Sequence, residues 1–192
     1  MIDRIKLSPT SWIAIAVVAL VQTAVLAGIV HGRVAILRDG REIVTEVIPV
    51  DPRDLFRGDY VILGYAFGRG DVEVPEGTSQ GDTVYVTLRE AAPEQWEVVA
   101  TSATYEAAGD PAQVVLKGIA GHVYRPQDAE RAKASIRYGI ESYFVPEGTG
   151  RALEEKVREK KISAVLAVGT SGDVAIKALV VDGERVAEEP LL

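Results

Sequence analysis

The chain has 192 residues, with 21 basic against 28 acidic side chains, a net charge of −7, and no cysteine. An acidic protein repels phosphate backbones, so the charge argues against nucleic acid as a partner. The lack of cysteine excludes disulfides, thiolate metal ligands and cysteine nucleophiles.

The first feature along the chain is an apolar segment, residues 12–30, that carries no charge. A helix of this length rises about 28 Å, close to the thickness of a bilayer's hydrocarbon core, so we predict a transmembrane helix that binds the lipid bilayer through residues 12–30. A cleaved secretory signal is an alternative, with Arg4 and Lys6 as its basic part and residues 25–27 as the cleavage site. The apolar region of such a signal is shorter, about 7–15 residues, which favours an uncleaved signal anchor. A buried helix of a soluble core is disfavoured because the rest of the chain is too polar to cover it.

Charges around this segment bear on its orientation. Arg4 and Lys6 precede it, whereas Arg33, Arg38 and Arg41 follow it, so the positive-inside count slightly opposes export of the C-terminal part. Long domains translocate largely regardless of such charges. We therefore expect a single-pass protein of the inner (cytoplasmic) membrane with an extracytoplasmic C-terminal domain.

We divide the chain into an anchor over residues 1–32 and a single β-rich domain over residues 33–192, which is long enough for a hydrophobic core. The segment 34–38 either prolongs the helix, with Gly40 as its end, or begins the first strand. Periodicity does not decide between the two.

The domain begins with segments typical of β-strands. Residues 60–67 alternate, with Val61, Leu63, Tyr65 and Phe67 on one face. The expected strands of this part cover residues 41–50, 60–67, 83–88, 96–101 and 114–124. The last of these is interrupted by Gly118 and Gly121, which predict a bulge or bend and hence a barrel or rolled sheet.

The C-terminal part adds a helix and a hairpin. Thr149 suits the N-cap of an amphipathic helix over residues 150–161, and two apolar strands, 162–168 and 174–181, follow it. A short strand at 184–186 comes after a turn. The fold class predicted is α+β: an N-terminal transmembrane helix followed by a mainly antiparallel β domain, barrel-like or a rolled sheet, with one long amphipathic helix.

A short repeat is visible, because residues 74–78 and 145–149 both read Val-Pro-Glu-Gly-Thr. Both copies suit a β-turn with proline second and glycine fourth. We interpret them as two similar turns, not as a duplicated domain.

Residues 58–65 read Gly-Asp-Tyr-Val-Ile-Leu-Gly-Tyr and match every fixed position of the pattern Gly-Asp-Tyr-x-x-Leu-x-Tyr. The chain thereby resembles the GDYXXLXY protein family of bacterial membrane-anchored proteins, and the segments 49–54 and 137–148 resemble that family's lead-in and C-terminal block. The resemblance implies a membrane-linked β-rich domain, often encoded near multi-pass membrane proteins. It therefore makes a multi-pass membrane protein a candidate partner and implies no reaction.

The motif also has a physical interpretation. Its fixed residues are Gly58, Asp59, Tyr60, Leu63 and Tyr65. Gly58 permits a positive φ, Asp59 can accept hydrogen bonds from turn amides, and a strand follows, so a structural role is favoured. A functional role would use a patch rich in aromatic residues and arginine, the types that most often carry binding energy at interfaces. The candidate patch consists of Asp51, Arg53, Arg57, Asp59, Tyr60, Tyr138, Glu141, Tyr143 and Glu147.

Evidence for catalysis or metal binding is thin. Asp51, Asp54 and Asp59 lack the spacing of an EF-hand, and His31 and His122 are the only histidines. Acid–base pairs such as Asp173 with Lys177, or Glu141 with Glu147, occur in almost every domain. We therefore expect no metal site, no cofactor and no catalytic residue.

The function predicted is that of a non-catalytic envelope protein that docks on a membrane partner through the surface near residues 51–60 and 138–148. One alternative is a hydrolase of envelope polymer that uses Asp or Glu carboxylates, and another is a small-ligand-binding β domain. Converging carboxylates with raised pKa values would indicate the enzyme. A patch rich in aromatic residues and arginine would indicate docking.

Overall fold

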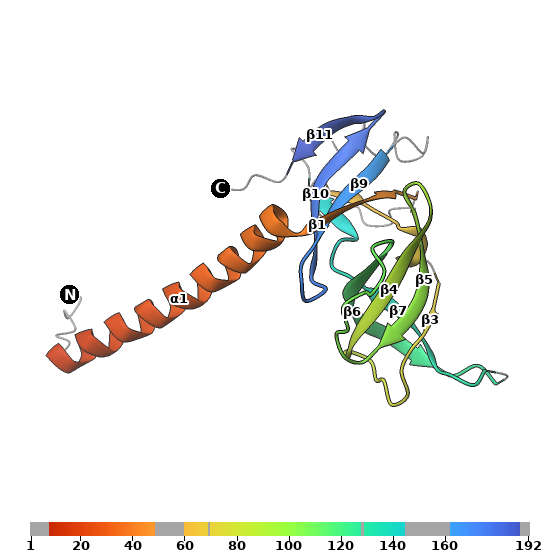
Figure 1. Ribbon diagram of the computed structural model, residues 1–192. Helices are drawn as coiled ribbons and strands as arrows, with labels where there is room; N and C mark the ends of the chain where they lie inside the picture. The colour runs from red at the N-terminus through yellow and green to blue at the C-terminus, as the bar shows by residue number, and fades with distance from the viewer. Residues whose placement is uncertain (1–7, 49–59, 69, 128, 145–161, 189–192) are drawn as a thin grey trace. The chain divides into compact units, whose positions relative to one another are not determined.

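The computed structural model describes residues 8–48, 60–68, 70–127, 129–144 and 162–188 (Figure 1). The chain forms two compact units, residues 1–35 and residues 36–192. Its elements are the helix α1 (Pro9–Asp39), the 3-10 helix η1 (Ala66–Gly68), and the strands β1 (Arg41–Glu46), β2 (Tyr60–Ile62), β3 (Val72–Glu73), β4 (Thr83–Ala92), β5 (Gln95–Ser102), β6 (Gln113–Tyr124), β7 (Lys133–Arg137), β8 (Ser142–Phe144), β9 (Ile162–Val168), β10 (Val174–Val181) and β11 (Glu184–Glu188).

The helix α1 contains the whole predicted membrane segment. Its 31 residues correspond to about 46 Å of helix. Large apolar side chains along it are exposed, for example Trp12 at 61% and Leu20 at 70%. Within the described part of the chain, α1 is the one helix long and apolar enough to cross a membrane. A membrane anchor and an N-terminal signal sequence both have this character.

The helix continues to Asp39, so the helical alternative for residues 34–38 is right and the strand alternative is wrong. The amide of Gly40 donates to the Ile36 carbonyl over 2.9 Å, and a Cβ at Gly40 would clash with that same oxygen. Glycine is therefore required where the helix ends and β1 begins. Leu37, in the last turn of α1, is buried within the larger unit.

The larger unit contains three antiparallel sheets, with strand orders β1-β9-β10-β11, β2-β8 and β3-β7-β6-β4-β5. The five-stranded sheet curls into a nearly closed barrel (Figure 1). At its seam the hydroxyl of Thr101, on β5, donates to the Glu73 carbonyl, on β3, over 2.8 Å. The predicted antiparallel, barrel-like α+β fold is confirmed.

One hydrophobic core joins the two larger sheets. Val84, Val86 and Leu88 of β4 are fully buried, as the alternation predicted, while the residues between them are half-buried. Six of the seven residues of β9 are buried, which is the pattern of a strand covered on both faces. The hairpin formed by β9 and β10 has the predicted bounds. The core therefore follows from the apolar pattern of the strands.

The two glycines of β6 act differently. The register between β6 and β7 shifts between Ala120 and Val123, so the bulge lies at Gly121, as predicted. At Gly118 a Cβ would clash with the side chain of Ile136 and would lie 3.2 Å from the Arg137 carbonyl. Gly118 thus allows β7 to approach β6 closely.

The predicted strand over residues 60–67 is too long. β2 ends at Ile62, and the chain turns into η1, where the Gly68 amide donates to the Tyr65 carbonyl over 3.0 Å. Leu63, Tyr65 and Phe67 are nevertheless buried, as predicted. Alternation identified the core residues correctly but overestimated the regular ladder.

The turn at residues 74–78 differs from its prediction by one position. The Thr78 amide donates to the Pro75 carbonyl over 3.2 Å, so proline is first and Gly77 third. Gly77 has φ +83°, which the third position of a type II turn requires. The second copy of the turn and the predicted helix over residues 150–161 lie outside the described residues.

Candidate functional site

Part of the signature motif, residues 58–65, pairs with part of the C-terminal block, residues 137–148. Strand β2 lies antiparallel to β8, with Tyr60 opposite Phe144. Immediately after β2, the amide of Leu63 donates to the Glu141 carbonyl over 2.9 Å. Two segments about eighty residues apart therefore form one structural element.

Residues that follow β2 and precede β8 form an aromatic cluster, Tyr65, Phe67 and Tyr138. The rings of Tyr65 and Phe67 stack with centroids 5.2 Å apart, and Phe67 meets Tyr138 edge-on at 5.5 Å. The buried hydroxyl of Tyr65 donates to the Ile140 carbonyl over 2.9 Å. The last fixed residue of the motif therefore fastens the C-terminal block to the core.

The two tyrosines of the cluster differ in their hydrogen bonding. The buried hydroxyl of Tyr138 has no hydrogen-bond partner among the described residues, unlike that of Tyr65. Burial, and next the nearby charge of Glu141, raise the pKa of both phenols. One Glu141 oxygen also accepts a hydrogen bond from the Tyr138 amide over 2.5 Å. Both phenols are therefore held in the neutral form, which suits packing and not acid–base chemistry.

The predicted patch is described in part. Tyr60 lies in β2, Tyr143 lies half-buried in β8 against the core, and Glu141 holds the turn before β8. Tyr138 is only 7% exposed and belongs to the core, although the prediction included it in a surface patch. The remaining predicted residues lie outside the described part of the chain: Asp51, Arg53, Arg57, Gly58, Asp59 and Glu147.

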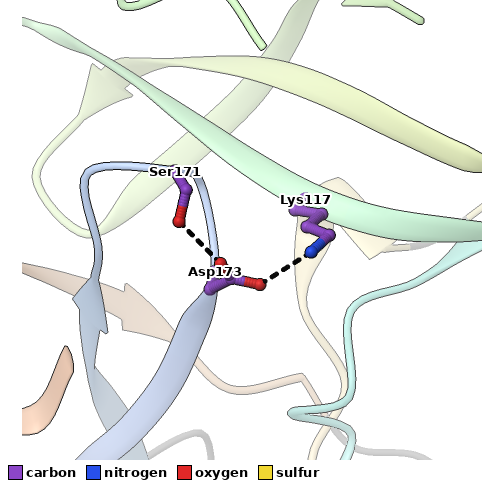
Figure 2. A network of polar contacts seen from close by, with 3 residues as sticks. All are labelled: Lys117, Ser171 and Asp173. Atoms are coloured by element: carbon purple, nitrogen blue, oxygen red, sulfur yellow. Dashed lines mark hydrogen bonds and ion pairs between the residues drawn. The ribbon is translucent and has the colours of Figure 1, made fainter. Parts of the chain in front are cut away.

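A polar network that the sequence did not indicate joins β6 to the β9–β10 hairpin (Figure 2). The Lys117 ammonium lies 3.1 Å from one Asp173 oxygen, and the Ser171 hydroxyl donates to the other over 2.7 Å. Burial raises the pKa of Asp173, but hydrogen bonds from Ser171 and Lys117 outweigh it, so the pKa is lowered. The hydrogen bond to Asp173 raises the pKa of Lys117.

This network is an ion pair and not a nucleophile with its base. A serine–lysine mechanism requires a neutral lysine beside the hydroxyl, whereas Lys117 is held charged and contacts the carboxylate. Lys177, the partner suggested for Asp173 by sequence, instead pairs with Glu42 over 2.8 Å. Asp173 and Lys177 therefore each pair with a different residue.

The same network fastens the hairpin to the five-stranded sheet. The Lys117 amide donates to the Gly172 carbonyl over 2.8 Å, at a part of β6 that β7 does not reach, because their pairing begins at Ile119. A cavity of about 380 Å³ adjoins this point, lined by Lys117, Gly118, Ile119, Arg137, Tyr138, Gly139 and Asp173. The Lys117–Gly172 hydrogen bond and the Lys117–Asp173 ion pair therefore link the five-stranded sheet to the four-stranded sheet.

Metal ligands do not gather in the described ranges, where no group of three or more His, Asp or Glu side chains could hold an ion. His122 is exposed and stacks on Tyr124, with centroids 6.0 Å apart. Two cavities of about 480 and 310 Å³ lie instead at the seam of the barrel.

The comparisons with known proteins agree with the signature. The family model described as GDYXXLXY protein matches residues 22–179, which is most of the chain. The chain therefore belongs to this family. Searches of curated proteins and of solved structures give no match.

Proposed function

We propose that this member of the GDYXXLXY family is a membrane-anchored, non-catalytic interaction module of the bacterial cell envelope. Its anchor is the N-terminal helix over residues 1–32, it resides in the inner membrane, and its domain over residues 33–192 is extracytoplasmic. Its partner is a multi-pass membrane protein, which docks on the surface near residues 51–60 and 138–148.

One observation carries the docking proposal: Tyr60 lies directly opposite Phe144 in the β2–β8 pair. The chain therefore enters β2 from residues 51–59 at the place where it leaves β8 toward residues 145–148. We propose that these two segments contribute to one surface, which we call the docking surface. Its proposed members are Asp51, Arg53, Arg57, Asp59, Tyr60, Glu141, Tyr143 and Glu147, whereas Tyr138 belongs to the core.

The composition of the docking surface supports a protein partner. It contains two tyrosines and two arginines, the types over-represented among residues that dominate binding energy. The exposed apolar side chains of α1 support attachment to a bilayer, where a protein partner would also be embedded. A membrane partner follows from combining these two features.

Two carboxylates of the described residues, Glu42 and Asp173, are unsuited to act as the general acid of a hydrolase. A general acid for polymer cleavage needs a raised pKa, so that it carries a proton at neutral pH. Hydrogen bonds from Lys177 and Arg185 lower the pKa of Glu42, and the pKa of Asp173 is also lowered. These two groups are therefore ionised and tied into ion pairs, which is unsuitable for a proton donor.

The proposal is tested by site-specific photo-crosslinking in native membranes. A photoreactive phenylalanine derivative replaces Tyr60 in one variant and, as a matched control, the exposed Tyr105 in another. We expect a discrete adduct with an integral membrane protein from position 60 and not from position 105. The adduct should weaken when Arg57 is changed to Gln, because a charged contact of the interface is lost.

Two outcomes would contradict the proposal. The first is a folded, membrane-bound protein that gives no adduct at position 60. The second is the same adduct at both positions, which would indicate random collision in the membrane.

A further inference from the structure

The barrel is left open between its two edge strands, β3 and β5. In the strand order of the described residues, β3 pairs with β7 alone and β5 with β4 alone. The contact across the seam is made by the Thr101 side chain and not by a backbone ladder. One edge of β5 therefore presents main-chain donors and acceptors that no described strand uses.

Two adjoining cavities follow this seam, and they share Thr101 and Arg131. The smaller, of about 310 Å³, is lined by Val72, Glu73, Val98, Val99, Ala100, Thr101 and Arg131. The larger, of about 480 Å³, lies between the end of β5 and the start of β7. Each has the volume of a small-molecule site.

Both signs of charge border the larger cavity: Arg125 and Arg131 are cationic, and Glu76 and Glu130 are anionic. The side chains of all four are exposed, and none forms an ion pair or hydrogen bond with another described residue. The charges therefore do not neutralise one another, although they surround the same hollow.

We propose that this seam binds a short zwitterionic peptide. The carboxylate of the peptide pairs with Arg131 or Arg125, its ammonium group pairs with Glu130 or Glu76, and its main chain bonds to the free edge of β5. Recognition of an extended peptide by a free strand edge is a common binding mode, in which backbone hydrogen bonds provide affinity.

The charge pattern selects this class of ligand. A purely anionic ligand would be attracted by the two arginines but repelled by the two glutamates, and a cation would meet the reverse. A zwitterion satisfies both pairs. The strand edge then favours a peptide over other zwitterions, and Val99, which is 38% exposed and skipped in the register with β4, provides an apolar contact.

The test is calorimetric titration of the full-length protein in detergent micelles with trialanine. We expect saturable binding with Kd of about 1 mM, weak because the site is exposed. Arg131→Gln should weaken binding about ten-fold, the loss expected for one charge-assisted contact. Arg137→Gln is the matched control, since Arg137 is also exposed but lies outside both cavities, and it should leave Kd unchanged.

Blocked probes separate the two ends of the ligand. Trialanine amide and N-acetyl-trialanine should each bind more weakly than trialanine. Absence of saturable binding to a folded protein, or equal weakening by the two arginine variants, would overturn the proposal. Acetate that binds as well as trialanine would reduce the seam to a simple anion site and would also overturn it. The seam shares no residue with the docking surface, so the two proposals stand or fall separately.

Discussion

The aromatic cluster offers one chemical change with opposite expected effects at two positions. Tyr65→Phe and Tyr138→Phe each remove a single hydroxyl from a buried ring. The hydroxyl of Tyr65 donates to the Ile140 carbonyl, whereas that of Tyr138 has no partner among the described residues. We therefore expect Tyr65→Phe to destabilise the domain and Tyr138→Phe to stabilise it.

The magnitudes follow from the cost of unsatisfied buried polar groups. Tyr65→Phe leaves the carbonyl of Ile140 without its donor, which costs about 1–3 kcal/mol. Tyr138→Phe removes a hydroxyl that is buried without compensation, a gain of about 1–3 kcal/mol by the same reasoning. The small void left by one oxygen atom reduces that gain.

Thermal unfolding of the full-length protein in micelles measures both effects. For a domain of this size, 1 kcal/mol corresponds to a shift of about 2–4 °C in Tm, so the two variants should lie on opposite sides of the wild type. A lower Tm for Tyr138→Phe would refute the reasoning, because it would mean that a bound water or another group satisfies the Tyr138 hydroxyl.

Four further expectations concern the core, the hairpin, acid stability and the membrane. Leu63→Ala should lower the free energy of unfolding by about 2–5 kcal/mol, because Leu63 is 1% exposed; a loss below about 1 kcal/mol in denaturant titration would contradict its place in the core. Gly172→Ala should lower the free energy of unfolding more than Gly183→Ala, although both glycines have φ +86°. Only at Gly172 does a Cβ meet the backbone of β6, at 3.3 Å. Equal losses of stability would show that backbone strain alone decides the effect. The pKa of Asp173 is lowered, so its ion pair stabilises the fold at pH values above the unfolded-state pKa of about 3.9, and this stabilisation is lost as the pH falls below that value. Asp173→Asn should therefore flatten the acid part of the Tm–pH profile. An unchanged slope would assign the acid dependence of Tm to other groups. A chain with Asp110→Cys should remain in the membrane pellet after an alkaline wash and react with an impermeant thiol reagent in intact spheroplasts, whereas labelling only after lysis would place the domain in the cytoplasm.

Long strands with a clear pattern were predictable from sequence. The alternation in β4 gave its buried face, and the continuous apolar runs of β9 and β10, separated by a glycine-rich turn, gave both the strands and their ends. In these strands local composition and burial agree, because each residue's partner lies on a neighbouring long strand.

Short strands were not predictable in the same way. β3 has two residues and β8 has three, too few for a periodic signal, and they exist because of pairing with distant segments. The strand predicted over residues 60–67 is shortened for a related reason. β8 pairs with its first three residues only, after which the chain turns into η1.

The site residues also differ in whether a local sequence pattern could predict them. Burial of Tyr138 was open to prediction, because Ile136, Tyr138 and Ile140 recur at every second position, as on the inner face of a strand. The Lys117–Asp173 pair joins residues 56 positions apart and depends on how the hairpin docks, which no local pattern encodes. Sequence therefore identified candidate types but not tertiary partners.

The signature motif combines two kinds of residue, and this decides how its substitutions should be interpreted. Leu63 and Tyr65 are buried and fasten the C-terminal block, so changes at either reduce the amount of folded protein and, with it, every activity. Tyr60 begins β2, opposite the end of β8. A loss of partner binding in Leu63→Ala would therefore carry no information about docking. The informative comparison is Tyr60→Ala. Unchanged Tm with loss of capture of the membrane partner would support docking, and unchanged Tm with unchanged partner capture would make the motif a folding element alone.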